Sequence, residues 1–122
     1  MAYSARTVSL QDYNYFTFPY VRDTAVSTDE IMYKGTHNLA NIDKLFYCLT
    51  ALKSGAVDHQ ILIKVGTTTE ATIAVNNLAF QVYSDYIDVS GYPGNHDITI
   101  LLDCLGAGYI SVKDVNLHGV IA

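Results

Sequence analysis

The 122-residue sequence has no tryptophan and only two prolines, and Lys, Arg, Asp and Glu together make up 16% of it. Typical soluble domains carry about 25% charged residues. The 12 acidic and 7 basic side chains give a formal net charge of −5. Such an acidic balance lacks the basic surface with which proteins neutralise the phosphates of DNA or RNA. We therefore expect no nucleic acid partner.

Long apolar runs are also missing. A membrane-spanning helix needs about 18 or more consecutive apolar residues. The longest apolar stretches here, Leu45–Leu52 and Ile98–Leu102, each contain a threonine and end at Lys53 and Asp103. The first residues also lack the basic start and apolar core of a secretory signal. We expect neither a membrane span nor export by that route.

The sequence contains two cysteines, Cys48 and Cys104, and both lie within apolar runs. One disulfide between them is an open alternative. Their apolar setting and the missing secretory signal favour two reduced thiols that pack as small hydrophobic side chains.

Residues suited to catalysis are scarce. Two glutamates, Glu30 and Glu70, accompany ten aspartates, and the spacing does not pair two carboxylates as glycoside hydrolysis requires. The segment Gly106–Gly108 lacks the third glycine and the following helix of a nucleotide-binding loop, and no Gly-x-Ser-x-Gly motif occurs. We predict a protein that has no enzymatic activity and needs no cofactor.

The pattern of histidines and carboxylates does not favour a metal site. The four histidines occur singly, without the spacing of zinc ligands, and we expect them at the surface or at an interface; they are His37, His59, His96 and His118. Near the turn over residues 90–95, Asp85, Asp88 and Asp97 form with His96 a possible Ca²⁺ site. The favoured alternative is that these aspartates accept hydrogen bonds from their own turns. We predict no metal site.

What the sequence does contain is alternation of apolar and polar residues, which is typical of half-buried β-strands. Ile61–Val65 and Ala71–Val75 alternate in this way on either side of a glycine-containing turn, and predict a hairpin. Ile98–Leu102 and Tyr109–Lys113 predict a second hairpin across Gly106–Gly108. The apolar phase then shifts by one residue near Lys113 and Asp114, which indicates a β-bulge.

Further strands are expected over Tyr13–Tyr20, Glu30–Gly35, Lys44–Lys53 and Gln81–Val89. Lys44–Lys53 also fits a short helix, but ten residues suit a strand better. About eight strands joined by short turns predict one domain over residues 1–122. Its expected fold is an all-β antiparallel β-sandwich of the jelly-roll type.

The sequence is rich in tyrosine, with ten in all. A phenol combines an apolar face with a polar tip, so it suits subunit interfaces and sugar stacking. Four residues in or beside turns are candidates for contact with a glycan: Tyr92, Asn95, His96 and Tyr109. The alternative is that the tyrosines cover the sheets or contact other subunits. Because charge is scarce, we expect exposed apolar patches that partner chains cover.

Two segments in the C-terminal third of the chain, YIDVSGYPGNHDITILL from Tyr86 and GYISVKDV from Gly108, carry a resemblance. They are similar to the closing strands of jelly-roll domains in tailed-phage virion proteins and in carbohydrate-binding modules. The resemblance implies a non-enzymatic capsid decoration or appendage protein. Such a protein would form a homotrimer, bind capsid or tail proteins, and belong to a virion assembled in the host cytoplasm. The alternative is a carbohydrate-binding module or receptor-recognition head.

Overall fold

The computed structural model describes residues 6–9, 20–23 and 30–121, and every helix or strand element in these ranges is a β-strand. The strands are β1 (Arg6–Ser9), β2 (Tyr20–Asp23), β3 (Glu30–Asn38), β4 (Ile42–Lys53), β5 (His59–Val65), β6 (Thr68–Val75), β7 (Gln81–Asp88), β8 (Asn95–Asp103) and β9 (Tyr109–Ile121). No helix in these ranges has the length and apolarity needed to cross a membrane.

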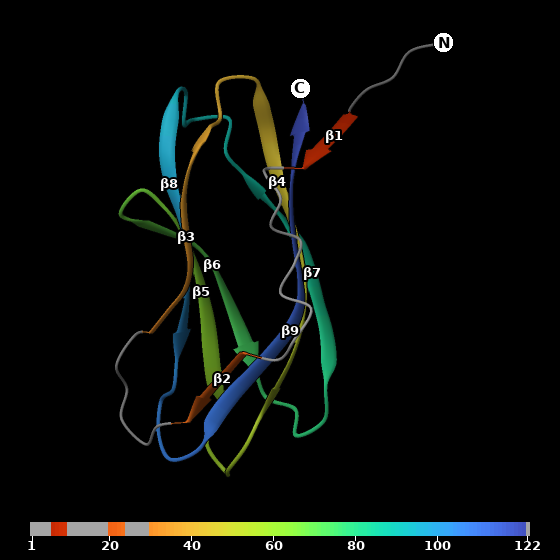
Figure 1. Cartoon of the computed structure of the whole chain (residues 1–122), viewed down its shortest axis with the longest axis vertical. Helices are drawn as coiled ribbons and strands as arrows, with labels where there is room; N and C mark the ends of the chain where they lie inside the picture. Colours follow the sequence, from red (N-terminus) through yellow and green to blue (C-terminus); the bar gives the residue numbers. More distant parts are fainter. Residues whose placement is uncertain (1–5, 10–19, 24–29, 122) are drawn as a thin grey trace.

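The strands form two antiparallel sheets that face each other (Figure 1). The first has the order β1-β9-β4-β7, with β2 also paired to β9, and the second has the order β3-β8-β5-β6. Among the described strands, β5 and β6 are the only two that are both consecutive in sequence and paired, so the chain crosses from one sheet to the other at most connections from β3 onward. This winding is that of a jelly roll, and the predicted fold class is confirmed.

The core lies between the sheets and is built by alternation along each strand. In β5, Ile61, Ile63 and Val65 are fully buried, while the residues between them are half-buried on the outer face. Strand β4 repeats this pattern through Leu45 and Leu49. Burial of each such side chain contributes about 1.5–3 kcal/mol to folding. The period-two pattern of the sequence therefore selects the face that each strand turns toward the core.

Several sequence predictions are confirmed by the strand register. The hairpin of β5 and β6 pairs Ile61 with Ile73. The segment predicted as a strand rather than a helix is β4, which lies between β7 and β9. The β-bulge is present in β9, where Leu49 of β4 faces two residues, Asp114 and Val115. Asp114 has φ of 53°, a left-handed conformation that is uncommon outside glycine.

The predicted hairpin of β8 and β9 is wrong. Strand β8 pairs with β3 and β5, whereas β9 pairs with β1, β2 and β4 in the other sheet. Residues 104–108 between them pass from one sheet to the other. Alternation indicates which face of a strand points toward the core, but it carries no information on which strand lies next in the sheet.

Two further predictions concern the cysteines and the N-terminal region. No disulfide joins Cys48 and Cys104; Cys48 is half-buried on β4, and Cys104 is buried just after β8. The aromatic strand predicted over Tyr13–Tyr20 lies outside the described residues except for its last residue, which begins β2.

The start of β9 is held to the end of β4 by an exchange of hydrogen bonds. Ser54 N–H donates to the Tyr109 carbonyl, and Tyr109 N–H donates to Ser54 Oγ, each at 2.9 Å. Gly108 makes this approach possible: its φ is 120°, and a Cβ there would lie 2.2 Å from the Ser54 carbonyl oxygen.

We expect Gly108→Ala to lower the free energy of unfolding by about 1–3 kcal/mol, because alanine adds both a strained φ and a backbone clash. The matched control is Gly91→Ala, since a Cβ at Gly91 meets nothing within 4 Å. Urea denaturation of both variants measures the effect. Equal stability of the two variants would show that the contact contributes nothing.

Candidate functional site

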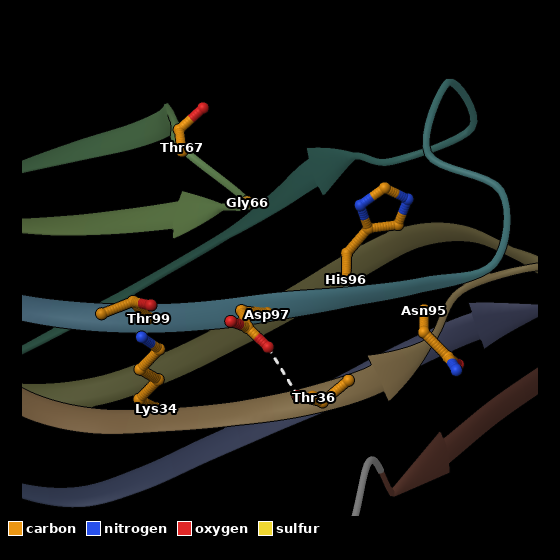
Figure 2. A pocket seen from close by; sticks show the side chains of 8 residues that line it. All are labelled: Lys34, Thr36, Gly66, Thr67, Asn95, His96, Asp97 and Thr99. Atoms are coloured by element: carbon orange, nitrogen blue, oxygen red, sulfur yellow. Dashed lines mark hydrogen bonds between the residues drawn. The ribbon is translucent and has the colours of Figure 1, made fainter.

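An open pocket of about 380 Å³ lies on the outer face of the β3-β8-β5-β6 sheet, near the start of β8 (Figure 2). Its lining comes from β3, from the β5–β6 turn and from β8: Lys34, Thr36, Gly66, Thr67, Asn95, His96, Asp97 and Thr99. Hydroxyl, amide, carboxylate, ammonium and imidazole groups are all present, so the pocket offers both donors and acceptors of hydrogen bonds.

The floor of the pocket follows from the register of β3 and β8. Thr36 lies opposite Asp97, and Lys34 lies opposite Thr99. Because side chains alternate along a strand, these four residues face outward while Ile98 between them enters the core. The Thr36 hydroxyl donates a hydrogen bond of 2.5 Å to the Asp97 carboxylate (Figure 2). This bond fixes the Asp97 side chain beside β3.

The β5–β6 turn forms one wall. Gly66 N–H donates to the Asp97 carbonyl at 2.8 Å, which holds the turn against β8. Thr67, next in the turn, is exposed at the rim of the pocket. The hairpin therefore contributes to the site by closing one side of it.

The connection from β7 to β8 forms another part of the site. His96 Nε2 lies 2.9 Å from the Pro93 carbonyl oxygen, and the Tyr92 ring meets the His96 ring edge-on at 5.4 Å between ring centres. The Tyr92 hydroxyl donates to the Glu70 carboxylate, and this hydrogen bond raises the pKa of the Tyr92 phenol. Tyr92 thus supports His96 and does not itself line the pocket.

The four residues that the sequence marks for glycan contact fall into two places. Asn95 and His96 line the pocket, with Tyr92 behind them, whereas Tyr109 begins β9 at the opposite end of the sandwich. The sequence does not point to Lys34, which also lines the pocket, because nothing local to β3 shows that it lies beside β8.

Two of the four histidines are buried, so the prediction of surface histidines is wrong for them. His37 and His59 are 6% and 1% exposed and occupy core-facing positions of their strands. His37 Nε2 lies 2.7 Å from the Tyr33 hydroxyl, and His59 Nδ1 accepts a hydrogen bond from Leu105 N–H. The hydrogen bond to Tyr33 offsets part of the cost of burying His37, whereas His59 Nε2 is buried without a hydrogen-bond partner. Burial also lowers the pKa of His37.

Of the three aspartates considered as Ca²⁺ ligands, Asp85 and Asp88 accept hydrogen bonds from nearby residues, and Asp97 accepts one from Thr36 on β3. The Asp88 carboxylate accepts from the Ser90 hydroxyl at 2.7 Å and from Ser90 N–H at 2.9 Å, and these bonds lower the pKa of Asp88. The Asp85 carboxylate accepts from Tyr86 N–H. In residues 6–9, 20–23 and 30–121, no three His, Cys, Asp or Glu side chains are grouped to hold a metal ion.

A second surface feature is an apolar strip along the edge strand β7 and the loop before it. We define the β7 strip as Leu78, Phe80, Val82 and Tyr86, which are between 40% and 68% exposed. Strand β7 pairs only with β4 among the described strands. The strip continues onto β4, because the Phe46 ring lies 5.1 Å from the Tyr86 ring.

Comparison with known proteins shows a likeness of fold. No protein-family model and no curated protein matches the chain. The CBM36-1 domain of a multidomain xylanase from the hindgut metagenome of Trinervitermes trinervoides is similar with a TM-score of 0.58 and 9% identity, over 98% of both chains. A CBM4 structure is similar with a TM-score of 0.54 and 10% identity, over 93% of this chain and 94% of that one.

The chain is also similar to a capsid protein, the D431N mutant of VP2 from infectious bursal disease virus in T=1 particles. The TM-score is 0.56 and the identity 13%, over 97% of this chain but 32% of VP2. At such identities these comparisons show the jelly-roll fold alone.

We expect acid to weaken the fold through His37. Its lowered pKa means that the unfolded chain takes up a proton near pH 6.5 while the folded chain does not, so the free energy of unfolding falls as the pH drops below about 6.5. The loss is at most about 1.4 kcal/mol per pKa unit.

The variant His37→Gln isolates this contribution, because glutamine does not titrate. We expect it to be less stable than the wild type at about pH 7, since the bond to Tyr33 is changed. The difference in the free energy of unfolding should then narrow toward about pH 5. A difference that stays constant over this range, measured by urea denaturation, would contradict the assignment.

Proposed function

We propose that the chain is a non-enzymatic structural protein of a virus particle, of the capsid decoration or appendage type, and that it binds neighbouring subunits through the β7 strip. The observation that carries this proposal is the exposure of Leu78, Phe80, Val82 and Tyr86 on one edge of the sandwich. Contiguous apolar side chains on a protein surface mark sites that other proteins cover.

Three features support this proposal. The strip combines aliphatic and aromatic side chains, which is the composition of the buried centre of a protein interface. Lys113 lies over the Phe80 ring at 4.3 Å and Lys44 lies 6.0 Å from the Tyr86 ring centre, so charged side chains border the apolar surface. The jelly-roll likeness to VP2 places the same kind of domain in a capsid protein.

In this proposal the occupant of the strip is a second copy of the chain, and the assembly is a homotrimer that docks onto capsid or tail proteins in the virion. A cyclic trimer uses a heterologous contact, so the strip of one copy packs on a different surface of the next.

We expect the wild-type chain to show a trimer mass by light scattering, and Val82→Asp to weaken association by about tenfold or more, because it places a charge in the buried contact. The control is Ala74→Asp, at an exposed position of β6 in the other sheet. A wild-type monomer at millimolar concentration, or equal effects of the two variants, would contradict the role of the strip.

A second candidate function is glycan recognition, either as a carbohydrate-binding module or as a receptor-recognition head. The observation that favours it is the pocket on the outer face of the β3-β8-β5-β6 sheet, whose lining includes the Asp97 carboxylate, the hydroxyls of Thr36 and Thr67 and the amide of Asn95. Sugar hydroxyls both donate and accept hydrogen bonds, and these side chains meet both needs.

We expect Asp97→Ala to weaken glycan binding by about tenfold, which is the worth of a hydrogen bond to a charged group. Titration calorimetry with saccharides chosen from a glycan array measures the loss. The control, Asp85→Ala, removes a carboxylate from β7 in the other sheet. If no saccharide on the array binds the wild type, glycan recognition is excluded.

A further inference from the structure

Two lysines lie on either side of one threonine on the outer face of the β3-β8-β5-β6 sheet. The register pairs Thr99 of β8 with Lys34 on β3 and with Lys64 on β5. Neighbouring strands are about 4.8 Å apart, so the two lysine backbones are separated by about 10 Å, with Thr99 between them. In Figure 2 the Lys34 side chain extends from β3 toward Thr99.

The ammonium groups of Lys34 and Lys64 differ in their contacts from those of the other three lysines. Lys53 forms an ion pair of 2.8 Å with Asp58, and Lys44 and Lys113 lie over aromatic rings. Neither Lys34 nor Lys64 has an ion pair or hydrogen-bond partner within residues 30–121. An anionic group bound over Thr99 would therefore find two ammonium groups on either side that have no direct ion pair of their own.

Lys34 and Thr99 line the pocket, and Lys64 lies beside it on β5, opposite Thr99. The other lining residues determine which groups of a ligand can lie next to its anionic group. Asp97 lies two residues from Thr99 on the same strand and faces the same side, about 7 Å away. Its carboxylate accepts hydrogen bonds from hydroxyl groups and repels a second anion. The amide of Asn95 and the hydroxyls of Thr36 and Thr67 add uncharged polar groups to the lining.

We propose that the pocket binds an acidic saccharide, a uronic acid, whose carboxylate lies over Thr99 between Lys34 and Lys64. The hydroxyl groups of the sugar then face Asp97 and Asn95. Ammonium–carboxylate contacts of this kind are charge-assisted hydrogen bonds, which are stronger than the neutral hydrogen bonds of the remaining pocket. This inference rests on the second proposed function, glycan recognition, and adds the class of sugar.

The experiment compares uronic acid oligosaccharides with their methyl esters, which keep the ring and the hydroxyl groups but lose the charge. Oligomers of galacturonic, glucuronic and mannuronic acid are titrated into the full chain by calorimetry at low salt. We expect at least one acid to bind about tenfold or more tightly than its ester, with the preference falling as salt increases.

Lysine variants test whether Lys34 and Lys64 cause the preference for the acid over its ester. We expect Lys34→Gln with Lys64→Gln to weaken binding of the acid much more than binding of the ester, so that the ratio of acid to ester affinity falls to about one. The control Lys113→Gln removes a positive charge from β9, in the other sheet, and should leave the ratio as in the wild type. Thermal unfolding of each variant verifies that the fold is retained.

Three results would overturn the inference, and they are distinguishable. If acids and esters bind with equal affinity, glycan recognition stands but the role of the lysine pair fails. If none of the acids or esters binds, the inference fails, and the glycan array decides separately whether neutral sugars bind. If inorganic phosphate displaces the acid at a similar concentration, the site holds bare anions and not a saccharide.

Discussion

The structure depends on the burial of alternate side chains between two sheets. Each strand of the β3-β8-β5-β6 sheet places one set of residues, such as Ile61 and Ile100, in a common core and turns the other set outward. Since the inner set is committed to packing, functional variation is confined to the outer set and to the connections. The pocket and the β7 strip are both built from those remaining positions, on different sheets.

The sequence predicts the strands and their buried faces well because these depend on neighbours along the chain. The hairpin of β5 and β6 and the bulge at Asp114 are local features, and both are present. The assignment of β8 and β9 to one hairpin failed, because strand partners in a jelly roll are mostly distant in sequence. Burial of His37 was missed for a similar reason, since its position opposite β8 is not encoded locally.

In the candidate site, too, the sequence reveals the local features but not the contacts between strands. Asn95 and His96 were recognised because they follow a turn, and turns are visible in sequence. The pairing of Lys34 with Thr99 and of Thr99 with Lys64 arises only when three strands align. The two surfaces correspond to two chemistries, one that excludes water from apolar side chains and one that exchanges hydrogen bonds with a polar ligand.

The position of β9 has a consequence for how the chain acquires its structure during synthesis. This last strand is the neighbour of β1, β2 and β4, so it lies in the interior of its sheet. Residues 109–121 must therefore leave the ribosome before the sheet can form. Until then, the edges of β1, β2 and β4 that pair with β9 have no partner strand. Pairings between strands so distant in sequence slow folding, and strand edges that are still unpaired are exposed to aggregation in the meantime.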